Sequence, residues 1–157
     1  MFDFEDSDYE ALSGFGLLWR WTSPNHAEFP ANILNGIRPI ADSKAALINE
    51  YVVARADQHG RLELEFFTDV RRINAGRKAE SAVRDWLTRL PVADDATVIV
   101  SWDARTAVTA PFRLVADCWS DFFYPASDDA AVIPLRGEWM LVWHHEEHFE
   151  FGVSIRR

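Results

Sequence analysis

Near its end the chain carries two apolar segments that are separated by a short run of histidine and glutamate. The first segment is WMLVW at 139–143, the second is FEFGVSI at 149–155, and HHEEH lies between them. In both segments large apolar residues recur at every second position, which is the period of a β-strand. The pattern predicts a β-hairpin with a polar tip, and it constrains the fold more than any other part of the sequence.

The alternation also predicts how the two strands of this hairpin align. We expect His145 to pair with Phe149, which places His144 directly across from Glu150. The tip then has three residues, Glu146, Glu147 and His148. One face of the hairpin becomes wholly apolar, with Trp139, Leu141, Trp143, Phe149, Phe151, Val153 and Ile155. A slip by one residue would mix the apolar and polar sets, so burial of the apolar face should exclude it.

The rest of the chain alternates between strand-like and helix-like segments. The predicted elements are a strand at 15–21, a helix from Asp42 or Ser43 to about Gln58, a strand starting at Arg61, a helix after Gly76 that stops at Pro91, a strand at 97–102, a helix at 111–123 and a strand at 131–135. Consecutive strands at the end of the chain favour an antiparallel arrangement. We therefore predict an α+β fold with a mainly antiparallel sheet, about three helices packed on one face, and a C-terminal β-hairpin.

Length and composition fit one folded domain over residues 1–157. A chain of 157 residues, 48% of them hydrophobic, has enough apolar material for a packed core. The first ten residues hold five acids and no base, which is unlike a secretory leader. We expect residues 1–12 to form a mobile acidic arm, and a cytoplasmic location is the simplest interpretation.

The formal net charge of -9 is unevenly distributed. Residues 114–152 hold eight acids against Arg136 alone, whereas residues 71–90 are mainly basic. An excess of acids repels phosphate backbones, so we expect no nucleic-acid partner. No apolar run approaches the roughly 18 residues that would span a membrane, so we expect no membrane partner either. An acidic surface suits a basic protein partner, such as a toxin domain.

The predicted contact residues lie in the acidic loop after the third helix and in the closing hairpin. They are Asp121, Asp128, Asp129, His144, Glu146, Glu147, His148 and Glu150. The segment Ser127–Asp128–Asp129 follows a proline and has the composition of a turn. A proton-transfer role for these aspartates together with His144 is the alternative interpretation.

The three histidines of the tip also raise the question of a metal site. On a strand His144 and His145 would point to opposite faces, so at most one of them could join His148. The HHEEH string lacks the HExxH order of zinc helices. The sequence therefore favours a solvated tip, and we assign no catalytic residue, no metal ligand and no cofactor. Cys118 falls on the buried stripe of a predicted helix beside Trp119, where a thiol is usually inert.

The stretch 97–152 is similar to small uncharacterised bacterial proteins, some of them placed near immunity proteins of contact-dependent toxins. The similarity lies in DCWSDFFYPASDD and in GEWMLVWHHEEHFEFG, and it covers about a third of the chain. It implies a stand-alone α+β protein that acts by binding.

Two hypotheses follow. The first is a non-enzymatic soluble binding protein, such as an immunity protein that blocks a basic toxin through an acidic surface. The second is a small metal-dependent or acid/base hydrolase that uses His144, Glu150 and an aspartate from 121–129. Convergence of these side chains on a pocket would favour the enzyme, and a flat or convex acidic surface would favour binding.

Overall fold

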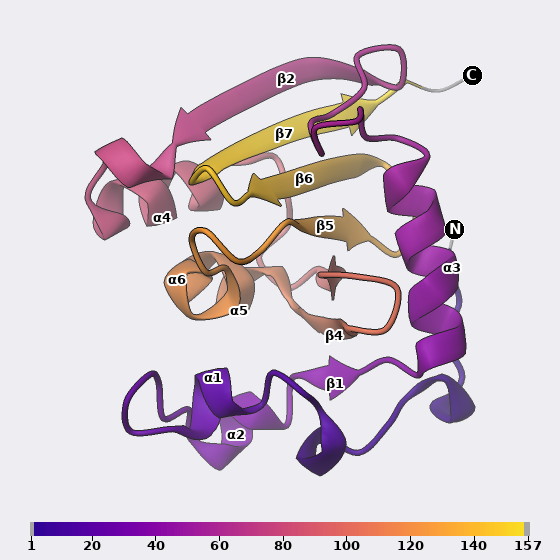
Figure 1. Cartoon of the computed structure of the whole chain (residues 1–157), viewed down its shortest axis with the longest axis vertical. Coiled ribbons are helices and arrows are strands. Elements are labelled where there is room, and N and C mark those ends of the chain that lie inside the picture. Colours follow the sequence, from indigo (N-terminus) through magenta and orange to yellow (C-terminus); the bar gives the residue numbers. More distant parts are fainter. Residues whose placement is uncertain (1, 156–157) are drawn as a thin grey trace.

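Seven strands form one sheet in which every neighbouring pair is antiparallel (Figure 1). The computed structural model describes residues 2–155. The strands are β1 (Arg38–Pro39), β2 (Phe67–Asn74), β3 (Thr97–Ser101), β4 (Ala107–Pro111), β5 (Ala130–Pro134), β6 (Trp139–His144) and β7 (His148–Ser154). Their order across the sheet is β1-β4-β3-β5-β6-β7-β2. The α+β class and the antiparallel sheet are as predicted.

Within the described residues, all the helices lie before β5, and none lies among the last three strands. The α-helices are α1 (Trp19–Thr22), α2 (Ala31–Leu34), α3 (Asp42–Val53), α4 (Glu80–Thr88), α5 (Phe112–Asp117) and α6 (Trp119–Phe122). Three short 3-10 turns are η1 (Asp6–Asp8), η2 (Leu12–Gly14) and η3 (Ala75–Arg77). Within residues 2–155 no helix combines the length and the apolar character that crossing a membrane requires.

Both faces of the sheet are covered, which corrects the prediction of helices on one face. Along β3, Val98 and Val100 belong to one core cluster and Ile99 belongs to the other. Helices α4, α5 and α6 pack on the first cluster, and α3 packs on the second. Figure 1 shows α3 on the opposite side from α4, α5 and α6. The reason is that the central strands are apolar on both faces, as strands between two layers are.

The three predicted helices correspond to α3, α4 and the pair α5–α6. The first ends at Val53 rather than Gln58. After it the chain forms tight turns, with backbone bonds such as Arg55 N–H to the Val52 carbonyl. The third is shorter than predicted and is broken at Cys118, whose backbone leaves the helical region between α5 and α6. Its first predicted residue, Pro111, instead closes strand β4, which the sequence analysis did not identify.

Two predicted strands lie elsewhere. Residues 15–21 form turns and the start of α1, because the chain folds back there through backbone bonds such as Leu18 N to Phe15 O. The predicted strand that starts at Arg61 is a loop, and pairing with β7 begins only at Phe67. Both predictions relied on alternation of apolar residues alone. In the second segment that pattern does not reflect burial, because Leu64 is exposed in the loop that precedes β2.

The N-terminal segment contacts the body of the protein. Phe2 donates its backbone N–H to the Leu135 carbonyl at 2.7 Å, and its ring meets Tyr51 edge to face at 5.3 Å between centroids. Lys44 of α3 binds the Asp8 carboxylate at 3.1 Å. Residue 1 of the predicted arm lies outside the described residues. The mobility of residues 1–12 stays a prediction, and these contacts argue for a docked segment.

Candidate functional site

The hairpin between β6 and β7 turns through three residues, His145, Glu146 and Glu147. His144 pairs with His148, and Trp143 pairs with Phe149. Glu147 has a φ of 62°, and its N–H donates to the His144 carbonyl at 2.8 Å. A left-handed residue at the end of a three-residue turn is a usual way to close a hairpin.

The predicted register is therefore wrong by two residues. His144 does not face Glu150, since Val142 takes that place. The predicted apolar face is nevertheless kept over the paired residues, because a shift of two leaves every side chain on its own side. Burial of the aromatic face cannot distinguish two registers that differ by two residues. In the observed register Glu147 takes the left-handed position of the turn, and His148 also pairs with Asn74 of β2.

Three imidazole rings lie in contact at this tip. The His144 ring is 4.1 Å from the His145 ring and 4.7 Å from the His148 ring, measured between centroids. His144 is buried, His145 is exposed and His148 is partly buried. The sequence argument had placed His144 and His145 on opposite faces of a strand. His145 belongs to the turn instead, so that alternation does not apply to it.

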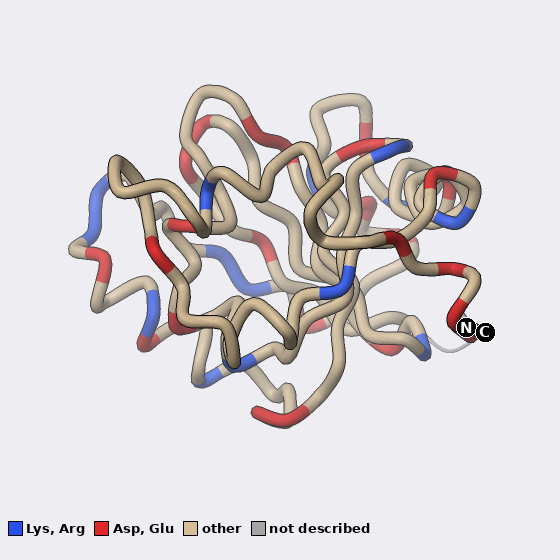
Figure 2. The backbone as a smooth tube through the Cα atoms, turned by 90° about the horizontal axis from the view of Figure 1, so that it is seen from below, with Lys and Arg blue, Asp and Glu red and all other residues tan. Residues whose placement is uncertain are grey.

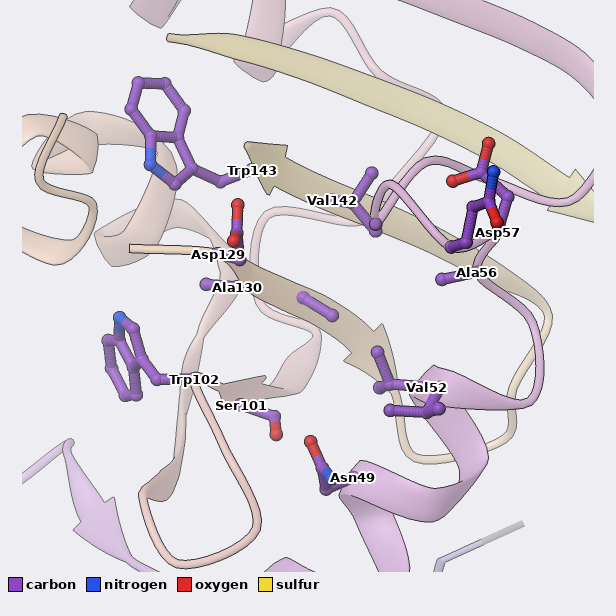
Figure 3. Close-up of a pocket in the computed structure, with 14 residues that line it drawn as sticks. Asn49, Val52, Ala56, Asp57, Ser101, Trp102, Asp129, Ala130, Val142 and Trp143 are labelled. Atoms are coloured by element: carbon purple, nitrogen blue, oxygen red, sulfur yellow. The ribbon is translucent and has the colours of Figure 1, made fainter. Parts of the chain in front are cut away.

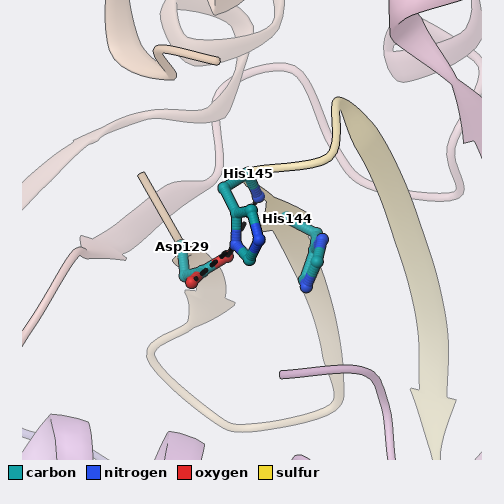
Figure 4. Close-up of side chains that lie close together, drawn as sticks. All are labelled: Asp129, His144 and His145. Atoms are coloured by element: carbon teal, nitrogen blue, oxygen red, sulfur yellow. Dashed lines mark hydrogen bonds and ion pairs between the residues drawn. The ribbon is translucent and has the colours of Figure 1, made fainter. Parts of the chain in front are cut away.

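Asp129 joins this group from the start of the neighbouring strand. Its carboxylate accepts a hydrogen bond from the His145 backbone N–H at 3.0 Å and contacts the ring Nδ1 at 2.9 Å (Figure 4). Burial raises the pKa of the Asp129 carboxyl, but the hydrogen bonds from His145 outweigh burial and bring the pKa below its ordinary value. The loop that carries Asp129 is tied to the same turn, since Ala126 N–H donates to the His145 carbonyl at 3.1 Å.

Asp128, the next predicted contact residue, is buried and paired. Arg20 Nη2 donates to its Oδ1 at 3.0 Å, and Arg20 and Asp128 side chains are only 6% and 7% exposed. The Tyr124 N–H donates to the other carboxylate oxygen at 2.9 Å. Asp128 therefore holds the shape of the loop from Tyr124 to Asp129 and offers no charge to a partner.

Glu150 is likewise withdrawn from the surface. It is 2% exposed, and its carboxylate accepts hydrogen bonds from Arg72 Nε at 2.8 Å and from the Leu62 backbone N–H at 3.2 Å. Glu146 and Glu147 at the tip are exposed. Apart from Asp121, the predicted contact residues thus divide into two buried, paired acids and a group that converges around the hairpin tip.

Asp121 lies in α6, outside the hairpin tip. Partial burial raises the pKa of its carboxyl, the Glu80 carboxylate adds to this effect, and Arg84 and His26 oppose it. A raised pKa means that the folded protein binds this proton more tightly than the unfolded chain does. Asp121 therefore destabilises the fold at neutral pH, and this cost disappears as the pH falls through its pKa.

We expect Asp121→Asn to raise the urea midpoint at pH 7. The gain should shrink as the pH falls, because the wild-type carboxyl takes up its proton at a higher pH in the folded protein than in the unfolded chain and then resembles the amide. Urea unfolding of both proteins at pH 7 and in acid measures it. A gain that stays constant with pH would contradict the electrostatic origin.

Two neighbouring cavities flank Asp129. One, of about 500 Å³, is polar and is lined by Gln58, His59, Gly60, Arg61, Asp129, His144, His145 and Glu146. The other, of about 300 Å³, lies between the end of α3 and the sheet (Figure 3). Apolar side chains such as Val52, Val142 and Trp143 line it, together with Asp129. The loop 58–61 is a part of this site that the sequence analysis missed, because that analysis ended a helix at about Gln58, began a strand at Arg61 and gave the residues between them no role.

A second group of rings lies near the loop that follows α6. Trp19, His26 and Tyr124 contact one another, with centroid distances of 4.6 Å for Trp19–His26 and 5.7 Å for Trp19–Tyr124. Tyr124 Oη and His26 Nδ1 are 3.1 Å apart. Trp19 is 42% exposed. A tryptophan held this far in the open is uncommon, because its indole is usually buried.

Cys118, at the break between α5 and α6, does not have the setting of a nucleophile. Burial raises the pKa of its thiol, and Asp121 and Asp117 raise it further. The thiolate is the reactive form of cysteine, so this environment keeps the side chain unreactive. Cys118 is only partly buried, and it packs against the same core cluster as Trp119.

Comparisons of this chain with family models, with curated proteins and with solved structures found no match. The argument for function therefore rests on the geometry of the hairpin tip, the loop from Tyr124 to Asp129 and the aromatic group beside it.

Proposed function

We propose that this protein acts by binding a basic protein partner, such as a toxin domain. The proposed contact surface consists of Trp19, His26, Tyr124, Asp129, Glu146 and Glu147. The observation that carries the proposal is the exposed Trp19 ring, which stands next to a loop that leads directly to exposed carboxylates. Tryptophan and tyrosine surrounded by a polar rim are the residues that contribute most to protein interfaces.

Hydrogen bonds and ring contacts from buried residues hold Tyr124 and its loop in place, which favours binding without rearrangement. Trp143 Nε1 donates to the Tyr124 carbonyl at 3.4 Å, and Ala126 N–H donates to the His145 carbonyl. The buried Arg20 guanidinium lies 4.2 Å from the Tyr124 ring centroid. Side chains that are already ordered lose little entropy when a partner binds, so their contacts contribute more to affinity.

Charge favours a basic partner over an acidic one. Asp129 and Glu146 side chains are 59% and 64% exposed, and the nearby Arg20 is neutralised by Asp128. Acids and bases are interspersed over the whole backbone (Figure 2), so the net charge of -9 acts mainly on the rate of encounter. The carboxylates of the contact surface supply local complementarity at the rim.

A hydrolase is the second candidate, and one observation favours it. The Asp129–His145 pair borders the polar cavity, and Asp129 also lines the apolar one, so a carboxylate-oriented imidazole stands beside a place for a substrate. His144 lines the polar cavity too. Glu150 cannot serve as predicted, because Arg72 and Leu62 occupy its carboxylate in the interior.

The proposal is tested with the products of the two genes that flank this one, each purified and titrated against the protein by calorimetry. We expect one basic product to bind, and Trp19→Ala to weaken binding about 30-fold or more, which corresponds to a loss of about 2 kcal/mol. Affinity should also fall as salt is raised, because the rim contacts are exposed charges.

Leu47→Ala is the matched control, since Leu47 is an exposed apolar side chain on α3, outside the contact surface. It should leave the affinity within about twofold of wild type. Equal losses from Trp19→Ala and Leu47→Ala would contradict the proposed surface. Absence of binding to both flanking products would contradict the proposed class of partner.

A further inference from the structure

We infer that Asp129, His144 and His145 form a binding site for one divalent transition-metal ion, with zinc the ion that this set of ligands suits best. One potential ligand atom from each of the three residues lies within 4.8 Å of the other two. This site goes beyond the proposed function, because it requires no partner protein.

Two features bring the three residues together: the pairing of β5 with β6 and the turn between β6 and β7. The Ala130–Trp143 pair sets the start of β5 beside the end of β6, so Asp129 reaches the tip. The turn then places His145 next to His144 rather than on the opposite face. An ion that binds here takes the place of the proton shared between His145 Nδ1 and the Asp129 carboxylate.

The distances suit an ion that enters with small side-chain movements. Zinc binds histidine nitrogen and carboxylate oxygen at about 2.0–2.2 Å, which sets neighbouring ligand atoms about 3.3 Å apart in a tetrahedron. His145 and Asp129 side chains are 47% and 59% exposed, so both can rotate toward the buried His144. Asp129 Oδ1 and His145 Nδ1 already lie 2.9 Å apart.

The ligand types select the class of ion. Two imidazoles and one carboxylate suit zinc and its neighbours among the first-row metals, whereas calcium and magnesium prefer oxygen ligands alone. Asp129 and Glu146 offset the single charge of Arg61 in the same cavity. Three protein ligands leave a coordination position open, and the polar cavity gives water or a small ligand access to it.

A second group competes for the same central ring. His144, Glu146 and His148 also present ligand atoms within 4.8 Å of one another. All of Asp129, His144 and His145 line the polar cavity, whereas His148 does not. This fact favours the set that contains Asp129 and His145, because an ion can reach all three of its ligands from one cavity.

Calorimetric titration of chelator-treated protein with zinc chloride tests the inference at pH 7.5. We expect one ion per chain with a Kd below 1 μM, and a weakening of about tenfold or more in each of Asp129→Asn and His145→Gln. Both side chains are exposed, so these variants should fold normally.

His59→Gln and His148→Gln are the matched controls. His59 lines the same cavity without belonging to either group, and His148 belongs only to the competing one. Both variants should bind zinc within about threefold of wild type. The inference is overturned if zinc does not saturate, if the loss in His148→Gln equals that in His145→Gln, or if His59→Gln weakens binding as much.

Discussion

Replacement of Asp128 by alanine is expected to lower the free energy of unfolding by about 3–5 kcal/mol, because it leaves the charge of Arg20 buried without its partner. Both side chains are almost inaccessible, and the pair is joined by two hydrogen bonds. The loss should be far larger than that from Asp129→Ala, next in sequence, whose exposed pairing with His145 is worth about 1 kcal/mol or less. Urea unfolding of the two variants measures the difference.

A double variant separates the loss of the pair from the loss of packing. In Arg20→Met/Asp128→Leu no charge remains buried, so most of the stability lost in Asp128→Ala should return. Arg20 also donates to the Phe122 carbonyl at 3.1 Å, so the recovery should be incomplete. Equal losses in Asp128→Ala and Asp129→Ala would contradict the importance of burial.

The same pair makes a prediction about acid sensitivity. Burial raises the pKa of the Asp128 carboxyl, but hydrogen bonds from Arg20 and from Tyr124 N–H outweigh burial, so the pKa lies below its ordinary value. The stability that this carboxylate contributes is present at neutral pH and is lost as the pH falls through the folded-state pKa. The effect of Asp128→Ala on unfolding should therefore be smaller in acid than at pH 7.

The loop that Asp128 holds also positions the candidate site. Tyr124 and Asp129 stand at its two ends, one in the aromatic group and the other beside His145. Asp128→Ala should therefore weaken both partner binding and zinc binding, although Asp128 touches neither. A metal-site variant such as His145→Gln should instead spare the aromatic group.

The sequence predicted the class of the fold, and the reason is visible in the hairpin. Alternation in 139–143 and 149–153 placed every paired side chain on its correct face. It could not choose between registers that differ by two residues, because both bury the same face. The predicted register placed Glu150 opposite His144, whereas in the structure His148 lies there. The tip therefore brings imidazoles together instead of an imidazole and a carboxylate.

Strand β4 shows a different limit. Its residues, AVTAP, include only two strand formers, Val and Thr, beside two alanines and a proline, and the sequence analysis begins a helix at Pro111. In the structure the segment pairs along its whole length with the strongly β-branched β3. A neighbour in the sheet, rather than the local sequence, makes this segment a strand.

The candidate site was predictable only in part. HHEEH and the aspartate pair are visible in the sequence, but which acids are exposed depends on bases far along the chain. Arg20 pairs with the buried Asp128, and Arg72 pairs with the buried Glu150. The two members of each pair are separated by 108 and 78 residues in the sequence. No spacing rule relates such distant residues, so a single sequence does not reveal their pairing.

Replacement of Trp119 by alanine is the second large expected effect, a loss of about 3–5 kcal/mol in the free energy of unfolding. The sequence placed Trp119 on a buried stripe, and the structure confirms that it is buried, at 8% exposure. Its ring lies 5.9 Å from that of Trp143 and 5.8 Å from that of Phe149, measured between centroids. It therefore joins α6 to both strands of the closing hairpin, and its removal leaves a cavity beneath them.

Trp119→Phe distinguishes the stability that comes from packing of the ring from the stability that comes from its hydrogen bond. Trp119 Nε1 donates to the Glu80 carbonyl at 3.2 Å, at the start of α4, and phenylalanine cannot replace that donor. We expect a loss of about 1–2 kcal/mol, because most of the apolar volume remains and only a partly exposed hydrogen bond is removed. Urea unfolding with unchanged m-values measures both losses on one scale. If Trp119→Ala cost no more than Trp119→Phe, the contact with Glu80 would matter more than packing, and the hairpin would not depend on α6 for its support.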